Sequence, residues 1–324
     1  MSKTDNLHDT ETLHDTETLH DTETLHDTET LNDTEASNHT VIVGYNGSDT
    51  SEEAVAWANS EASIRGAALR VVTCVEMPAM SGEAAMGWSS GAAYEAIREA
   101  SETTSAQVIA KIKASHPTLA VTANVVPGSA ASALLTDATA TDLIVVGASS
   151  HDGAAAFWLG TTPRSLVHNS PCPVAVIRGA ATRGAPDRIV VGIDGSATSD
   201  DAVVWAADEA DRHKVDLVLV HGWSYPYASV DARATQARDL TEVYADCTLT
   251  RSLELARERC GATVTGLLVE RSPVDALLES IKDGDLLVLG SHGHGGLRTR
   301  LLGSTVNSVL DGAAVPVVVV RPAA

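Results

Sequence analysis

A glycine-rich segment near the C-terminus has the composition of a phosphate-binding loop. It runs from Gly290 to Thr305 with the glycine spacing G-x2-G-x9-G, and two hydroxyl residues, Ser304 and Thr305, follow the last glycine. Glycine lets a backbone approach phosphate oxygens closely, and the unpaired N–H groups at the start of a helix donate hydrogen bonds to them. The segment therefore predicts a phosphate cradle where a strand leads into a helix.

An imperfect copy of the same loop lies upstream. The upstream residues correspond to the downstream ones as follows: Gly147 to Gly290, Ser150 to Gly293, Gly160 to Gly303 and Thr161 to Ser304. If position 150 needs a left-handed backbone, serine there costs about 1 kcal/mol. Residues 151–159 also contain no Arg or Lys, whereas Arg298 and Arg300 lie in the downstream loop. We expect weaker phosphate binding in the upstream copy.

The two loops belong to two copies of one larger unit. The segment VIVGYNGS at Val41 matches IVVGIDGS at Ile189, and PVAVIR at Pro173 matches PVVVVR at Pro316. In each copy, apolar runs of strand length alternate with longer helical stretches, which predicts parallel strands with crossover helices. The predicted strands lie near 41–45, 69–75, 121–126, 142–147 and 173–178, and near 188–193, 215–221, 263–269, 285–290 and 316–321.

The predicted fold is α/β, with two tandem domains that are each an open five-stranded parallel sheet with helices on both faces. We place the domains at 39–179 and 188–324, joined by a linker of Ala, Arg, Gly and Pro at 180–187. Long helices at 92–115 and 230–260 are expected to cover one face of each sheet.

The first helix of each copy has a predicted N-cap. Thr50 is followed by Glu53 three residues later, and Thr198 by Asp201 in the equivalent place, as in a capping box. We therefore expect the two threonines to cap these helices.

The spacing G-x2-G-x9-G-[ST] resembles the nucleotide loop of the universal stress protein family, in its tandem two-domain actinobacterial form. The resemblance covers residues 41–322 and implies a Rossmann-like fold, similar to the adenine nucleotide alpha hydrolases, that binds ATP with Mg²⁺ beyond the carboxyl ends of the strands. It assigns these loop residues to the nucleotide: Gly290, His292, Gly293, Gly303, Ser304 and Thr305, with Gly147, Ser150, Gly160 and Thr161 in the first copy.

The same resemblance assigns the adenosine part of ATP to the ends of the first two strands. Ile193 and Asp194 end the first strand of the second copy, and the backbone near Gly222 follows the second strand. Asn46 and Val75 are the corresponding expectations in the first copy. Asp194 also has a simpler interpretation, a turn-forming Asp-Gly-Ser whose side chain bonds the local backbone.

Three functions are compatible with the loops. The leading one is a nucleotide-dependent stress-response regulator with little or slow hydrolysis and a regulatory protein partner. The second is a slow ATPase or phosphotransferase with His292 or His294 as general base. The third is a nucleotide-free scaffold in which the glycines only form turns.

The composition excludes several classes of partner. The chain has 324 residues, 22 basic and 43 acidic, for a net charge of −21. Such a surface repels DNA, RNA and anionic lipid at long range, so we expect neither a nucleic-acid nor a membrane partner. The four cysteines have no C-x-x-C spacing, and apolar runs fall well short of the ~18 residues that span a bilayer. We expect a cytoplasmic protein with reduced thiols.

The N-terminal segment is a repeat. Residues 7–30 repeat Leu-His-Asp-Thr-Glu-Thr four times, and a decayed copy follows at 31–36. A period of six forms no apolar stripe on a helix or a strand, so 1–38 is expected to be a disordered acidic tail. Metal binding by His8, His14, His20 and His26 is the less favoured alternative, because this spacing does not bring ligands together without a fold.

The last strand of each copy is the expected contact between the copies. Pro173 and Pro316 open these runs, a position that proline tolerates in an edge strand, and an exposed edge invites pairing. In the family that the chain resembles, this strand commonly joins two domains, so the copies are expected to pair within the chain. Association of two chains into a homodimer is a further expectation.

Overall fold

The computed structural model describes most of the chain outside the N-terminal repeat. The described residues are 39–76, 92–148, 159–178, 185–225, 232–293 and 302–322. The predicted tail at 1–38, much of the linker at 180–187, and the loop residues Ser150, His151, His294, Arg298 and Arg300 lie outside them. We call the elements up to residue 178 the first copy and those from residue 185 the second copy.

Both copies have the same order of elements. The first copy consists of β1 (Thr40–Gly44), α1 (Asp49–Arg65), β2 (Ala68–Val75), α3 (Ala92–Ser115), β3 (Val121–Pro127), α4 (Ala130–Leu135), β4 (Leu143–Gly147), α5 (Thr161–Asn169) and β5 (Val174–Ile177). The second copy consists of β6 (Arg188–Gly192), α6 (Ala197–His213), β7 (Asp216–Trp223), α7 (Ala232–Arg259), β8 (Val264–Glu270), α8 (Pro273–Ser280), β9 (Asp285–Gly290), α9 (Ser304–Gly312) and β10 (Val317–Val320).

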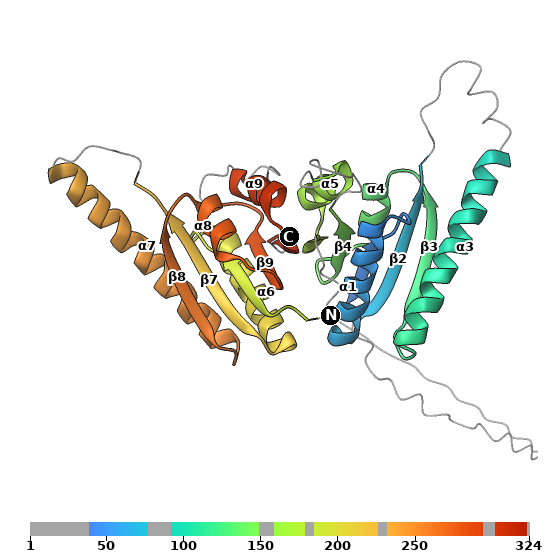
Figure 1. Cartoon of the computed structure of the whole chain (residues 1–324), viewed down its shortest axis with the longest axis horizontal. Helices are drawn as coiled ribbons and strands as arrows, with labels where there is room; N and C mark the ends of the chain where they lie inside the picture. Colours follow the sequence, from blue (N-terminus) through green and yellow to red (C-terminus); the bar gives the residue numbers. More distant parts are fainter. Residues whose placement is uncertain are drawn as a thin grey trace, which may run out of the picture. The chain divides into compact units, whose positions relative to one another are not determined.

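The strands of both copies form one sheet in the order β3-β2-β1-β4-β5-β10-β9-β6-β7-β8 (Figure 1). Within each copy every neighbouring pair is parallel, and β5 pairs with β10 in the antiparallel direction. The predicted α/β class with two tandem parallel five-stranded units is therefore confirmed. In each copy the order reverses between the first and fourth strands, which is where ligands of open parallel sheets bind.

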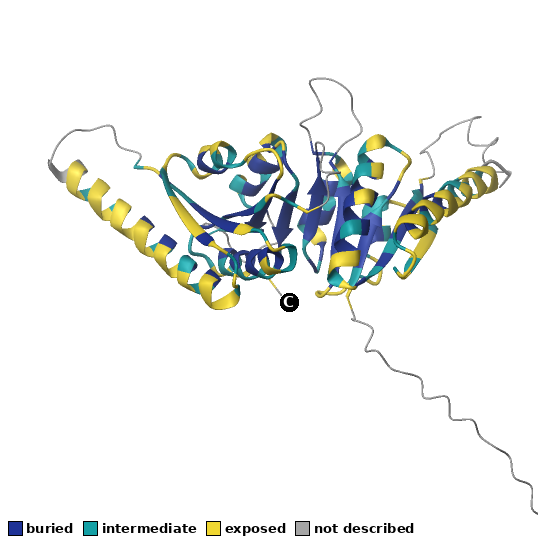
Figure 2. Cartoon of the chain, turned by 60° about the horizontal axis from the view of Figure 1, so that its bottom comes forward, coloured by how far each residue is buried: buried dark blue, intermediate teal, exposed yellow. Residues whose placement is uncertain are grey.

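Helices cover both faces of the sheet. One apolar layer packs α1, α3, α6 and α7 on the sheet, and the other packs α4, α5, α8 and α9 on the opposite face. Figure 2 shows the central strands buried and the outer sides of α3 and α7 exposed. The two long helices thus lie where they were expected, beside β2 and β3 and beside β7 and β8.

The predicted threonine caps are wrong by two residues. Ser48 and Ser196 are the N-caps of α1 and α6, and their side chains accept hydrogen bonds from the N–H groups of the residues three positions later. The preceding side chains explain the shift. Asn46 Oδ1 accepts from Ser48 N at 3.1 Å and Asp194 Oδ1 from Ser196 N at 3.0 Å, and these turns start each helix earlier.

The seam between the copies, formed by β5 and β10, is buried, and an arginine follows each of these strands. All four residues of β5 and of β10 are buried. Arg178, just after β5, donates to the Ala313 carbonyl at the end of α9, at 3.1 Å. Arg321, just after β10, donates to the carbonyls of Val167 and His168 near the end of α5, at 2.9 and 2.8 Å. Each copy therefore supplies a cation to a helix C-terminus of the other, which favours the pairing.

Among the described residues, none of the helices is long and apolar enough to span a bilayer.

The burial of the seam predicts a large effect of truncating its central valine. Val318 is fully buried and pairs with Ala175 across the seam. Val318→Ala is expected to lower the free energy of unfolding by about 2 kcal/mol, because two methyl groups and their packing are lost. Urea unfolding followed by circular dichroism measures this.

Leu267→Ala is the control for this variant. Leu267 lies on the edge strand β8 and is 39% exposed, so we expect a smaller loss of stability. Equal losses in the two variants would contradict a buried seam.

Candidate functional site

The candidate site of the second copy lies where β6 and β9 end side by side. Gly192, the last residue of β6, is in register with Leu289 of β9. Beyond these ends, β6 continues through Ile193 and Asp194 into α6, and β9 continues into Ser291, His292 and Gly293. The two predicted groups of nucleotide residues are therefore neighbours in space.

Asp194 lies directly against the glycine loop. Its Oδ1 accepts the hydrogen bond from Ser196 N, and Gly195 between them has φ +80°, a conformation that glycine adopts without strain. The other carboxylate oxygen faces Gly293, since a Cβ added to Gly293 would lie 2.3 Å from Asp194 Oδ2. The interpretation of Asp194 as a turn-forming residue is thus correct for Oδ1. Oδ2 borders the glycine loop.

Gly290 allows α6 to approach the end of β9. A Cβ at this position would lie 2.4 Å from the carbonyl oxygen of Thr198. Thr198 Oγ1 in turn donates to the His292 carbonyl, and it lies 3.1 Å from Ser196 Oγ. These contacts tie the first turn of α6 to the loop. Gly147 has the same role in the first copy, where its added Cβ would lie 2.6 Å from Thr50 O.

The start of α9 closes the site on its other side. Gly303 is the N-cap of this nine-residue helix, and its N–H donates to Ser291 O at 3.1 Å. Ser304 and Thr305 form the first turn, where backbone N–H groups are unpaired within the helix and attract anions. The nearest described atoms to a Cβ added at Gly303 are 3.8 Å away. Packing against the described residues therefore does not require glycine here.

Gly222 serves the packing of α8. A Cβ on it would lie 2.8 Å from Pro273 Cα and from Ala276 Cβ. Its neighbour His221 places Nδ1 2.7 Å from the Ile193 carbonyl, which links the ends of β6 and β7. The structure therefore brings Gly222 close to the other predicted residues. Glycine is required at this position because α8 packs directly against it.

The first copy contains a cavity of about 720 Å³ at the equivalent place. Four predicted residues line it, namely Asn46, Gly147, Gly160 and Thr161, whereas Val75 does not. The strand register matches Gly222 with Cys74 and Val75 with Trp223, so the expected correspondence was shifted by one residue.

Sequence reasoning missed two polar residues of this cavity. Cys74 and Glu76 line it beside Val72, because alternate residues of a strand share a face. Burial and the nearby Glu76 carboxylate raise the pKa of the Cys74 thiol, which keeps it protonated. The alternation in β2 was the signal that could have identified both residues.

Comparisons with known proteins agree with this architecture. A family model described as the universal stress protein family matches residues 37–178 and again 186–321. Universal stress protein Rv2005c of Mycobacterium tuberculosis is 33% identical over 297 residues, covering 87% of this chain and 97% of the relative. A universal stress protein of Mycolicibacterium smegmatis is 30% identical, with 87% and 97% covered.

A solved structure is similar in fold. The crystal structure of a universal stress protein from Archaeoglobus fulgidus covers 87% of this chain and 98% of its own, with a TM-score of 0.58 and 19% identity.

The contrast between Gly290 and Gly303 gives a stability prediction. Gly290→Ala forces the first turn of α6 away and is expected to lower the free energy of unfolding by about 1–3 kcal/mol. Gly303→Ala, with open space and φ −60°, is expected to be neutral or slightly stabilising, within about 1 kcal/mol. Urea unfolding of both variants is the measurement, and a loss at Gly303 as large as that at Gly290 would contradict the described packing.

Proposed function

The chain belongs to the universal stress protein family, and we propose that its second copy binds ATP and acts as a nucleotide-dependent regulator in a stress response. The observation that carries this proposal is the meeting of Asp194, Gly293 and the start of α9 at one edge of the sheet. A carboxylate and a helix N-terminus at the switch point of an open parallel sheet suit the two ends of a nucleotide.

The first turn of α9 is the proposed phosphate site. Ser304 and Thr305 supply backbone N–H groups and two hydroxyls, and Gly303 precedes them without a side chain. The distance of the nearest described atoms from a Cβ added at Gly303 supports this assignment, because a bound phosphate would occupy the space over that residue. Gly290, His292 and Gly293 complete the loop in the proposal. Mg²⁺ would be held by phosphate oxygens and water, as is usual for this ion.

Asp194 is the proposed partner of the adenosine part. Its carboxylate borders the loop through Oδ2, where it would accept hydrogen bonds from ribose hydroxyls. The backbone at Ile193 and Gly222, joined through His221, borders the place proposed for the base.

The first copy is a second, weaker site in this proposal. Its cavity of about 720 Å³ lies within the roughly 300–1,000 Å³ usual for ligand pockets. Asn46 replaces the carboxylate and uses its Oδ1 for the turn, accepting from both the N–H and the hydroxyl of Ser48. An amide accepts weaker hydrogen bonds from ribose than a carboxylate does.

The surroundings of His292 argue against a serine nucleophile in the loop. Its Nδ1 lies 2.8 Å from Ser291 Oγ, but Ser291 is fully buried. A hydroxyl without access to substrate cannot act as a nucleophile, so Ser291 orients the imidazole ring and does not serve as a nucleophile activated by His292.

ATP binding is tested with variants at the two ends of the proposed site. Asp194→Ala is expected to weaken ATP binding about 10- to 100-fold, the equivalent of one charged hydrogen bond. Gly303→Ala is expected to abolish most binding while stability is kept, because its methyl group occupies the phosphate space. Isothermal titration calorimetry with Mg²⁺ and ATP measures both.

Two further variants serve as controls. Asp194→Asn keeps the turn and copies Asn46, so an intermediate affinity is expected. Gly160→Ala alters the first copy and should have a smaller effect than Gly303→Ala. Equal losses from the two glycine variants would refute the ranking of the sites, and wild-type protein that fails to bind ATP would leave the scaffold function in its place.

Hydrolysis is expected to be slow or absent. Purified protein incubated with Mg²⁺ and ATP should retain the nucleotide for hours without release of phosphate. Phosphate release that disappears in His292→Ala would instead support the ATPase alternative.

A further inference from the structure

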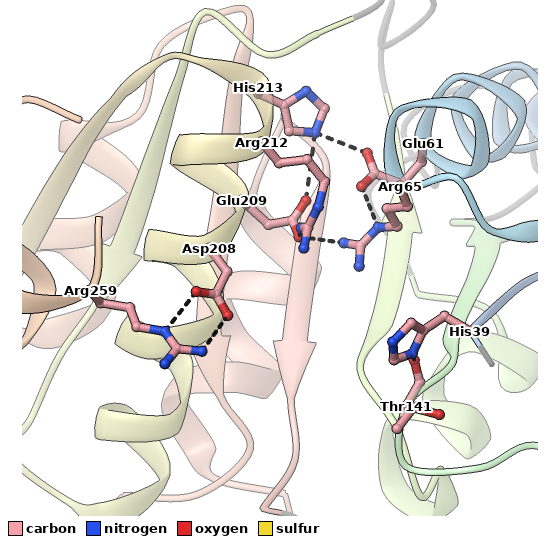
Figure 3. Close-up of polar contacts among 9 residues, drawn as sticks. All are labelled: His39, Glu61, Arg65, Thr141, Asp208, Glu209, Arg212, His213 and Arg259. Carbon is pink, nitrogen blue, oxygen red and sulfur yellow. Dashed lines mark hydrogen bonds and ion pairs between the residues drawn. The ribbon is translucent and has the colours of Figure 1, made fainter. Parts of the chain in front are cut away.

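The two copies meet at a second, polar contact, between α1 and α6. Glu61 and Arg65 of α1 face Glu209 and His213 of α6 (Figure 3). Each helix contributes a glutamate and, four residues later, a basic residue, and the repeat places Glu61 in register with Glu209 and Arg65 with His213. The contact is therefore pseudo-symmetric, except that an imidazole replaces one guanidinium.

Arg65 fixes one oxygen of each carboxylate. Its Nε lies 2.5 Å from Glu61 Oε1, and its NH2 lies 2.5 Å from Glu209 Oε1. Arg212 also pairs with Glu209 Oε1, and the Arg65 guanidinium lies over the Trp205 ring, 5.5 Å from its centroid. With the Oε1 atoms held in this way, both Oε2 atoms are turned towards His213.

The three remaining atoms converge in a buried space. His213 Nε2 lies 3.0 Å from Glu61 Oε2 and 3.6 Å from Glu209 Oε2. The side chains of the two glutamates are 2% exposed and that of His213 is 3% exposed. Glu209 Oε2 has no hydrogen-bond partner among the described residues, although burying an unpaired carboxylate oxygen is costly.

We propose that Glu61 Oε2, Glu209 Oε2 and His213 Nε2 bind a divalent transition-metal ion of the zinc type. Bonds of about 2.0–2.2 Å from Zn²⁺ to nitrogen and oxygen imply about 3.3–3.6 Å between ligands of a tetrahedral site, close to the two distances observed. One imidazole and two carboxylates are ligands that Zn²⁺ accepts, and the fourth position is left for water.

The charges around the site are compatible with a cation. The two carboxylates face the ion through their Oε2 atoms, and the two arginines bind the Oε1 atoms, which the metal does not use.

A metal here would link the two copies. Glu61 belongs to the first copy, and the other two ligands belong to the second. The ion would hold α1 and α6 together independently of the β5–β10 seam, so binding should raise the thermal stability of the whole described unit.

The test uses the full chain and Zn²⁺ alone, with and without a chelator. Wild-type protein should gain about 3–6 °C in Tm at zinc concentrations about 100-fold above Kd. His213→Arg is the matched variant, because it installs the residue of the pseudo-symmetric position 65. An ion pair with Glu61 is kept in it, whereas the nitrogen ligand is lost, so its Tm should not respond to zinc.

The histidines of the N-terminal repeat require a second control. A full-length variant with His8, His14, His20 and His26 all changed to Gln keeps the proposed site and should still respond to zinc in Tm. Equilibrium dialysis with metal analysis should find one Zn²⁺ fewer per chain in His213→Arg than in wild type. Equal zinc content and equal Tm shifts in His213→Arg and wild type would overturn the proposal. The absence of any Tm response to zinc in wild type would overturn it as well.

Discussion

Antiparallel hydrogen bonding between β5 and β10 is the constraint on which the arrangement of the two copies depends. These strands consist of apolar residues buried on both faces, and either one left at a sheet edge would expose unpaired backbone groups beside a row of branched side chains. Pairing them removes one edge from each copy. The sheet then ends at β3 and β8, the two strands whose residues are largely exposed or half-buried.

The seam also determines which helices of the two copies contact each other on each face of the sheet. With β5 beside β10, α5 and α9 come into contact, and Arg164 of α5 donates hydrogen bonds to Asn307 and Asp311 of α9 at 3.2 and 3.1 Å. On the opposite face α1 meets α6, with Arg65 and Glu209 in contact. Each of these helices begins beside a candidate nucleotide site, so the same elements that form the sites also form the contact between copies.

The strands were predictable from the sequence because parallel strands are buried on both faces and appear as short apolar runs. Each predicted strand agrees with the structure to within two residues. The helix starts were less predictable: Thr50 and Thr198 resemble caps, but the turns made by Asn46 and Asp194 place Ser48 and Ser196 in that role. A capping motif specifies the residue type, and only the preceding turn specifies the position.

The candidate sites were predictable only where the residue type itself is unusual. Glycine at 290 was recognisable, and the structure adds that Thr198 O requires it. The carboxylates of Glu61 and Glu209 gave no such signal, because glutamate is ordinary on a helix and their burial depends on a partner helix 148 residues away in sequence. An acidic residue at the same place on both repeats, among the buried alanines Ala58, Ala62, Ala206 and Ala210, is the pattern that could have indicated a buried polar contact.

The two copies share a topology but differ in chemistry at both ends of the proposed ligand. At the sugar end, Asn46 stands for Asp194, which removes a charge. At the base end, Cys74 stands for Gly222, so that the first copy has a thiol in its cavity where the second brings α8 against the strand. These substitutions change the contacts at both ends of the ligand. If the copies bind nucleotides as proposed, each copy therefore has its own nucleotide preference. The shared β5–β10 seam then makes the copies one folded unit with two different candidate sites.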